Sequence, residues 1–293
     1  MQIRFSGVRG SMPAPGPDTI RYGGNTSCVG VEFDTRVLIL DAGTGIRALG
    51  DTLAGGEKDL YVLFTHLHDD HIQGLPFFAP LYEEGRTVHL LQYHPPDGGA
   101  PWSPLELFDG RHFPLRPDDL PAHCHTVEHA PLAFLRRQGI DISRLVANHP
   151  GGAYGYRIQH EGQAFVYLPD NELVPPGEGR CSIEEVTAFC EGADVLCHDA
   201  QYRREDLSAK WGWGHSMVSQ ACALARRAGV GALVLFHHDP RRTDEALDAL
   251  QARARELLRD SAISCGAAWE GLRLDAEAIA AHAVAEPPPR PSS

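Results

Sequence analysis

Apolar positions along the chain fall into short runs separated by polar and turn-forming segments. Several of these runs are rich in β-branched and aromatic residues, which is typical of buried strands. They predict strands at 2–8, 29–41, 60–65, 193–197 and 230–236. Residues 153–168 alternate apolar and polar side chains on either side of Glu161-Gly162, which predicts a β-hairpin.

Other segments carry apolar residues three and four positions apart, the spacing of one helix face. They predict helices at 46–53, 129–138, 182–191, 216–228 and 243–260, with Ser216 as the N-cap of the fourth. These strands and helices agree with an α/β protein but do not by themselves determine its architecture. The range 80–147 is less regular, and Pro and Gly residues within it predict loops wrapped over one face.

The length of 293 residues fits one large α/β domain, and two small domains are the alternative. We expect a single domain over 1–285, in which 80–147 is a loop-rich insertion. The last segment, 286–293, reads EPPPRPSS. It has almost no apolar side chain to bury, so we expect it to be disordered.

Acidic residues outnumber basic ones by 39 to 26, which gives a net charge of −13. A surface of that sign repels phosphate backbones and disfavours broad binding to nucleic acid. A small anionic substrate remains compatible with it, because bound metal ions can reverse the field locally.

The seven cysteines are scattered and include no CxxC pair, which argues against a disulfide framework and for a reducing compartment. The N-terminus lacks the apolar segment of a secretory signal, and no run approaches 18 apolar residues. We therefore expect a cytoplasmic protein with no membrane partner.

The clearest chemical signal is the segment Thr65-His66-Leu67-His68-Asp69-Asp70-His71, which comes directly after an apolar run. Four side chains that bind metals lie within six residues, in the strand-then-loop context that such ligand motifs require. His66 and His68 can bind one ion, while Asp70 and His71 turn towards a second. Two neighbouring ions can activate water and stabilise both the attacked and the leaving oxygen.

The string His66-x-His68-x-Asp70-His71 resembles the ligand motif of the metallo-β-lactamase superfamily. The other motifs of that family follow in order along the chain. Asp41, in RVLILDAG, resembles the early aspartate that supports the ligand loop. The segments NHPGG, VYLPD and LVLFHHDP resemble the later ligand segments and contain His149, Asp170 and His237.

The resemblance implies an α/β fold of the αββα type, with two mixed β-sheets face to face and helices on both outer faces. It also implies two divalent ions, for which zinc fits the donors best and manganese or iron are alternatives. The implied ligands are His66, His68 and His149 for the first ion and Asp70, His71 and His237 for the second, with Asp170 bridging both. His238 remains an alternative to His237.

Three further segments resemble the phosphodiesterase branch of the superfamily, which includes phosphoribosyl cyclic phosphodiesterases and tRNA 3′-processing ribonucleases. His198-Asp199-Ala200-Gln201-Tyr202 and Gly212-Trp213-Gly214-His215-Ser216 resemble its acidic and GHS segments. The resemblance implies that Asp199 orients His215 beside the scissile phosphate. It also implies that Asp70 acts as both ligand and proton acceptor.

The third segment is the Gly-rich loop near the N-terminus, which contains Gly23-Gly24-Asn25-Thr26. Backbone amides there could bind phosphate oxygens, so Asn25 and Thr26 are candidate substrate-binding residues. The alternative is an ordinary turn, because Gly and Asn produce turns without any ligand.

We therefore predict a metal-dependent phosphodiesterase for a small phosphodiester, such as a cyclic nucleotide or cyclic ribose phosphate. The middle region is acidic and lacks the basic arm of tRNA-processing relatives, so tRNA and other large nucleic acids are disfavoured as partners. A homodimer is compatible with such a fold.

The alternatives are a thioesterase, a lactonase or another ester hydrolase of the same fold, and a di-iron protein for oxygen sensing or redox chemistry. The motifs at 198–202 and 212–216 argue against the first group. The redox relatives typically carry Glu where His68 stands, which favours hydrolysis.

Overall fold

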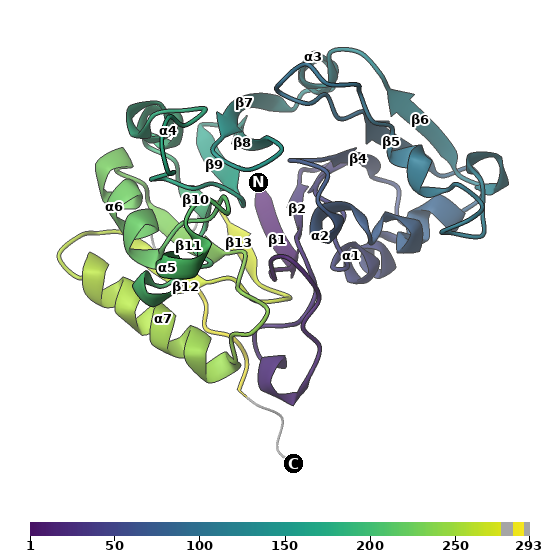
Figure 1. Ribbon diagram of the computed structural model, residues 1–293. Coiled ribbons are helices and arrows are strands. Elements are labelled where there is room, and N and C mark those ends of the chain that lie inside the picture. The colour runs from purple at the N-terminus through teal and green to yellow at the C-terminus, as the bar shows by residue number, and fades with distance from the viewer. Residues whose placement is uncertain (277–283, 290–293) are drawn as a thin grey trace.

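The computed structural model describes residues 1–276 and 284–289. The protein is built around two β-sheets with helices on their outer sides (Figure 1). The strands are β1 (Gln2–Gly7), β2 (Cys28–Glu32), β3 (Arg36–Leu40), β4 (Asp59–Leu63), β5 (Thr87–Leu91), β6 (His123–Val127), β7 (Asp141–Ala147), β8 (Ala153–His160), β9 (Gln163–Leu168), β10 (Val195–Asp199), β11 (Ala232–Phe236), β12 (Ser264–Ala267) and β13 (Arg273–Asp275). The α-helices are α1 (Ile46–Leu53), α2 (Asp69–Ile72), α3 (Pro131–Arg137), α4 (Ile183–Cys190), α5 (Leu207–Lys210), α6 (Val218–Ala228) and α7 (Asp244–Leu258).

Within the described residues, the first sheet has the strand order β13-β1-β2-β3-β4-β5-β6 and the second β12-β11-β10-β9-β8-β7. Both sheets are mixed. In the first, β1, β2 and β3 pair antiparallel, and β3 to β6 pair parallel. In the second, β7, β8 and β9 pair antiparallel, and β9 to β12 pair parallel. The carboxyl ends of neighbouring parallel strands therefore meet at one edge of each sheet.

The two sheets pack face to face through a continuous apolar layer. The ring of Phe5 on β1 lies 6.0 Å from that of Phe236 on β11, and the ring of Tyr167 on β9 lies 5.6 Å from Phe236. All three side chains are buried. The aromatic contacts join the inner faces of the sheets, so the core is shared by both halves of the chain.

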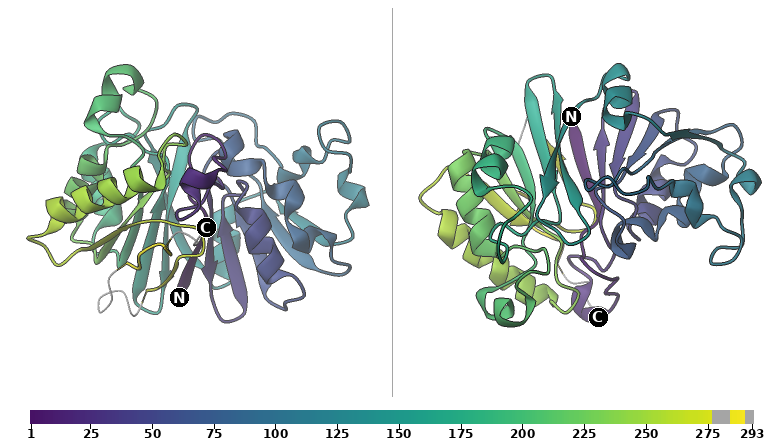
Figure 2. Two further views of the ribbon diagram at one scale, coloured as in Figure 1. Left: turned by 90° about the horizontal axis from the view of Figure 1, so that it is seen from below. Right: turned by 45° about the horizontal axis from the view of Figure 1, so that its top comes forward.

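A second apolar layer lies between the second sheet and helices α4, α6 and α7. It includes Leu196 and Leu233 from the sheet and Leu224 and Leu247 from the helices. In Figure 2 these helices cover the outer side of the second sheet, while α1 lies outside the first. The arrangement is the predicted αββα sandwich of two mixed sheets with flanking helices.

Several predicted elements differ from the structure in detail. The run at 29–41 forms two antiparallel strands, β2 and β3, with a turn between them. The range 80–147 contains β5, β6 and β7 as well as loops. The prediction that Ser216 caps its helix is wrong: α6 has Met217 as N-cap, and the Ser216 hydroxyl donates to the carbonyl of Asn171 at 2.6 Å.

The C-terminal segment 286–293 lies partly outside the described residues, from 290 onwards. Within its described part, the Glu286 carboxylate accepts a hydrogen bond from Gln251 at 2.8 Å, and the carbonyl of Pro288 accepts one from Arg21 at 3.1 Å. No helix among the described residues combines the length and apolar character needed to cross a bilayer.

Candidate metal centre

The predicted ligand loop begins where β4 ends. Asp41 follows β3 and His66 follows β4, and because these strands are parallel neighbours the two residues lie at the same sheet edge. The chain then turns at His68, the N-cap of the short helix α2, which carries Asp70 and His71. A strand end and one helical turn thus direct four donor side chains to one place.

The Asp41 carboxylate supports this ligand loop through hydrogen bonds. It accepts hydrogen bonds from the Thr65 backbone N–H at 2.7 Å and from the Tyr167 hydroxyl at 3.0 Å. It also lies 2.9 Å from Nδ1 of His71, which fixes the tautomer that leaves Nε2 free as a ligand. Asp41 is fully buried with a positive φ of 63°, a backbone strain typical of functional sites.

His66, His68 and His149 bring three ring nitrogens together, with His149 supplied by the loop after β7. Nε2 of His149 lies 3.1 Å from Nδ1 of His68. Zinc–nitrogen bonds of about 2.0–2.1 Å place neighbouring ligands of a tetrahedral site about 3.3 Å apart. Nδ1 of His149 donates to the carbonyl of Gly214 at 3.0 Å, which leaves Nε2 as the ligand atom.

Asp70, His71 and His237 form a second cluster, to which His237 comes from the residue after β11. Nε2 of His237 lies 3.1 Å from an Asp70 oxygen and 3.3 Å from Nε2 of His71, again the spacing of ligands around one ion. His238 points away from this cluster, because its Nε2 donates to the carbonyl of Ala268 at 2.9 Å. Of the two histidines, only His237 reaches the cluster.

Asp170, from the loop after β9, lies between the two clusters. One carboxylate oxygen is 3.1 Å from Nε2 of His71 and 3.3 Å from Nε2 of His237. The other oxygen is 3.8 Å from Nε2 of His66 and 3.7 Å from Nε2 of His149. Each oxygen thus faces one cluster, as a carboxylate that bridges two ions must.

Two buried ligand atoms without hydrogen-bond partners indicate that this set of histidines and aspartates, the metal cage, fits metal ions. Nε2 of His66 and Oδ1 of Asp170 are buried and have no hydrogen-bond partner among the described residues. An unpaired buried polar atom is costly, and a bound cation removes that cost. The donor set of imidazoles and carboxylates suits zinc and similar divalent ions.

The electrostatics of the cage also favour a cation. Burial opposes ionisation of Asp170, yet His237 and His71 hold the pKa of its carboxyl well below the usual range. Burial likewise opposes protonation of His71, but the carboxylates of Asp70, Asp170 and Asp41 raise the pKa of its imidazole well above the usual value. The ionised carboxylates therefore draw positive charge to the position between them, which a divalent ion can supply in place of protons.

His215 stands beside the cage and is held by Asp199, the last residue of β10. Nδ1 of His215 lies 2.7 Å from the Asp199 carboxylate, and both side chains are buried. Burial lowers the pKa of His215 to about 3. The ring is therefore neutral, with the Nδ1 proton donated to Asp199 and Nε2 left for a ligand.

A cavity of about 450 Å³ opens above these groups. It is lined by Ser11, Leu67, His68, Asp69, Asp70, His149, Asp170, Trp213, His215 and His237. The candidate ligands thus face a space large enough for a small ligand or for one unit of a longer chain.

The structure does not bring Asn25 and Thr26 to this cavity. Asn25 donates through its backbone and side-chain amides to Glu270, at 2.6 and 2.8 Å. Thr26 is fully buried, and its hydroxyl accepts from the Thr44 backbone N–H at 2.8 Å. Their hydrogen-bonding groups hold the N-terminal loop, which corresponds to the turn alternative.

Three residues with roles at the site escaped the sequence analysis. The backbone N–H of Ser11 donates to the Asp70 carboxylate at 2.6 Å. Glu172 accepts from the backbone N–H groups of Gly212 and Gly214, at 2.9 and 3.0 Å, and so fixes the loop that carries His215. Trp213 lines the cavity. Trp213 lies within the GHS segment but was given no role there, and Glu172 lies two residues after Asp170; no motif marks Glu172 or Ser11 themselves.

Comparison with known proteins agrees with this geometry. A family model described as "Beta-lactamase superfamily domain" matches residues 35–238, which include all the candidate metal ligands. The chain belongs to the beta-lactamase superfamily. With the His and Asp clusters at its sheet edge, it is a metal-dependent hydrolase of the metallo-β-lactamase fold.

Curated relatives and solved structures extend the comparison. The chain is 25% identical to Ribonuclease Z of Shouchella clausii, over 81% of this chain and 86% of the relative. It is 24% identical to Ribonuclease Z of Haloarcula marismortui, over 87% and 91%. The fold is similar to that of the metallo-beta-lactamase fold protein YhfI from Bacillus subtilis, with a TM-score of 0.65, 19% identity and coverage of 93% and 98%.

These relatives correct one prediction. The expectation that tRNA and other large nucleic acids are disfavoured as partners is wrong, because proteins matched over most of the chain are named for cleaving RNA. The expectation relied on the net charge of −13, which is an average over the whole surface. Binding depends on the local field, and arginines do gather in one pocket of this acidic protein, lined by Arg203, Arg204 and Arg253.

Proposed function

We propose that this protein is a phosphodiesterase that acts with two divalent ions, for which zinc fits the donor set best. The proposal rests on one observation above the others: the His215–Asp199 pair at the wall of the metal cavity. A metal site without further catalytic groups is compatible with many hydrolytic reactions. A hydrogen-bonded imidazole beside it adds a group that can protonate a leaving alkoxide or neutralise a phosphate oxygen.

Each residue then has a definite task. His66, His68 and His149 would hold one ion, Asp70, His71 and His237 the other, and Asp170 both. When bound, such ions polarise phosphoryl oxygens and lower the pKa of water to near neutrality. The Asp70 carboxylate, fixed by the Ser11 N–H at 2.6 Å, is placed to accept a proton from the attacking water.

His215 acts on the leaving-group side. Burial keeps its imidazole neutral in the absence of ligand. The negative charge of a bound phosphodiester favours the protonated ring, and Asp199 stabilises the positive charge through Nδ1. The proton on Nε2 can then pass to the departing oxygen.

The test is hydrolysis of bis(p-nitrophenyl) phosphate by the purified protein, with and without a chelator. We expect chelator-sensitive turnover that falls by about 10²–10⁴-fold in His215→Ala, the range of general acid–base catalysis. The matched control is His112→Ala, which breaks an exposed His–Asp pair with an Nδ1–oxygen distance of 2.6 Å. Turnover that survives complete metal removal, or that falls equally in both variants, would refute the proposal.

The size of the substrate needs its own measurement. A cavity of about 450 Å³ suits a small phosphodiester such as a cyclic nucleotide, while the relatives named Ribonuclease Z support RNA. Both fit the proposed chemistry. Rates on a 2′,3′-cyclic nucleotide and on a precursor tRNA, measured side by side, would assign the substrate class.

A further inference from the structure

Two exposed tryptophans, Trp211 and Trp213, precede His215 on the loop that carries it. Trp211 is 58% exposed and Trp213 is 60% exposed. Nearby Val174 is also 55% exposed. Large apolar side chains gathered on the surface beside a catalytic cavity mark a place where a ligand packs.

The loop holds these indoles in fixed positions. Nε1 of Trp211 donates to the carbonyl of Val174 at 2.9 Å. The backbone N–H groups of Gly212 and Gly214 donate to the buried Glu172 carboxylate. The indoles are therefore ordered before any ligand arrives, which reduces the entropy cost of binding.

A hollow of about 410 Å³ lies beside Trp211 and shares His215 with the metal cavity. Its walls are mainly apolar, from Val174, Leu207 and Met217, and polar groups reach it from Glu172, Ser208 and Gln220. A flat apolar group with hydrogen-bonding edges matches such a lining. Because His215 is common to both spaces, the group in the hollow would be attached to the phosphate at the metal centre.

We propose that the hollow binds the nucleobase next to the scissile phosphodiester and that Trp211, in its wall, is the stacking residue. The inference rests on the proposed phosphodiesterase function and narrows its substrate to nucleoside phosphodiesters. Every base presents a π-face, and stacking on an exposed aromatic ring is a common way to hold one. Trp211 therefore determines specificity and leaves the bond cleavage to other groups.

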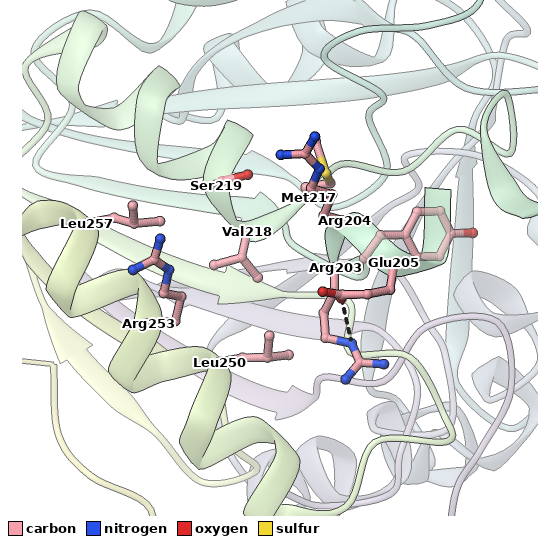
Figure 3. Close-up of a pocket in the computed structure, with 10 residues that line it drawn as sticks. Arg203, Arg204, Glu205, Met217, Val218, Ser219, Leu250, Arg253 and Leu257 are labelled. Atoms are coloured by element: carbon pink, nitrogen blue, oxygen red, sulfur yellow. Dashed lines mark ion pairs between the residues drawn. The ribbon is translucent and has the colours of Figure 1, made fainter. Parts of the chain in front are cut away.

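A pocket that adjoins the hollow at Met217 supports a nucleotide as the molecule bound in the hollow. Met217 is shared with a third pocket, of about 400 Å³, which is lined by Arg203, Arg204 and Arg253 (Figure 3). Arg203 pairs with Glu205 at 3.7 Å, whereas Arg204 and Arg253 have no ion pair with another described residue. The hollow thus lies between the metal cavity and a pocket that has three arginines in its wall, two environments that can each bind a phosphate.

The test compares two substrates with the same leaving group, thymidine 5′-(p-nitrophenyl phosphate) and methyl p-nitrophenyl phosphate. In Trp211→Leu, which keeps apolar bulk and removes the ring, we expect the ratio of kcat/KM for the thymidine substrate to kcat/KM for the methyl substrate to fall about tenfold, as lost base stacking predicts. The change should lie in KM for the thymidine substrate. Phe77→Leu, at an aromatic residue that is 59% exposed, should leave the ratio unchanged.

An equal loss on both substrates would overturn the inference, because it would show that Trp211 only supports the loop. A second readout works without turnover: thymidine 5′-monophosphate should quench tryptophan fluorescence saturably, and ribose 5-phosphate should not. If the wild type cleaves neither substrate, the phosphodiesterase proposal fails, and quenching that disappears in Trp211→Leu still supports a base site. Absence of saturable quenching in the wild type would overturn that site.

Discussion

At the scale of single residues, the metal centre depends on glycines that lie against the ligand rings. A Cβ built at Gly10 would be 2.3 Å from Nδ1 of His237, and one at Gly214 would be 2.2 Å from Nδ1 of His149. His237 itself has a positive φ of 59°, so its backbone has little freedom to retreat. These close contacts restrict the positions of the two imidazole rings sterically, in addition to their hydrogen bonds.

Gly10→Ala should therefore weaken metal binding without unfolding the protein. The added methyl group pushes the His237 imidazole away from Asp70 and Asp170, and we expect the affinity for zinc to fall at least about tenfold. Titration with zinc and a competing chelator would measure the change. Gly16→Ala is the matched control, because a Cβ there meets no atom within 4 Å. Equal zinc affinities in the two variants would contradict the argument.

The candidate ligands were predictable because short motifs carry them. Four donors lie within the six residues from His66 to His71, Asp170 and His237 each follow a predicted apolar strand, and His149 was identified from the order of the family motifs. Glu172 acts on Gly212 and Gly214, forty residues or more away in the chain, through backbone groups that leave no trace in the sequence. Asn25 was a candidate phosphate-binding residue because turns and phosphate-binding loops use the same residue types.

At the scale of elements, the loop 211–216 is held to the segment after β9 by one side chain. Each oxygen of the Glu172 carboxylate accepts from one backbone N–H of this loop, and the loop carries His215 after its two tryptophans. Hydrogen bonds to a charged group contribute about 1.5–3 kcal/mol each. Glu172 therefore positions His215 through the loop backbone.

Glu172→Ala should lower kcat about tenfold or more and leave the metal content unchanged, because the loop loses its anchor while the cage keeps its ligands. Glu172→Gln retains one acceptor oxygen and should recover part of the activity. Exposed Glu178, in the same segment, provides the control as Glu178→Ala. Loss of bound metal in Glu172→Ala would indicate a collapse of the site and count against a positioning role.

Three strands that sequence patterns missed, β5, β6 and β7, lie within the Pro- and Gly-rich range 80–147, where the apolar runs have no clear period. Two others, β12 and β13, have only four and three residues, too few to show a period. The hairpin of β8 and β9, in contrast, alternates regularly around Glu161-Gly162 and was predicted with its turn. The missed strands form because they pair with distant parts of the chain, whereas the local sequence of the hairpin is enough to specify it.

At the scale of the whole molecule, the metal cage joins the two sheets. His66, His68, Asp70 and His71 follow β4 of the first sheet, whereas His149, Asp170 and His237 follow strands of the second. Bound ions would therefore crosslink the two halves of the chain at one edge. Removal of the ions leaves buried carboxylates facing one another across the sheets.

Metal removal should accordingly lower the thermal stability. Free metal at a thousand times Kd contributes about 4 kcal/mol to the free energy of unfolding, so a chelator should lower Tm by several degrees. The affinity should fall as the pH drops, because the pKa of His71 is raised in the metal-free cage and its proton must leave when metal binds. Scanning calorimetry at two pH values, with metal content measured in parallel, would check both effects. An unchanged Tm after verified metal loss would contradict the crosslink.

The distribution of charge makes a prediction about substrate length. The arginine pocket lies beyond the proposed base hollow, so only a substrate with further phosphates can reach Arg204 and Arg253. The double variant Arg204→Glu/Arg253→Glu should weaken cleavage of RNA and leave a mononucleotide substrate unaffected. Loss of two phosphate contacts should also reduce the salt dependence, by roughly 1.4 in the slope of log K against log salt for a single strand.

A control must separate this local effect from the change in net charge. Arg47→Glu/Arg259→Glu makes the same change at side chains that are 71% and 64% exposed, on α1 and at the end of α7. If RNA binds through the arginine pocket, only the first variant alters the salt slope, because counterion release depends on the cations that contact phosphate. If both variants weaken RNA cleavage equally, the overall electrostatic field of the protein controls RNA binding, and Arg204 and Arg253 do not contact the RNA.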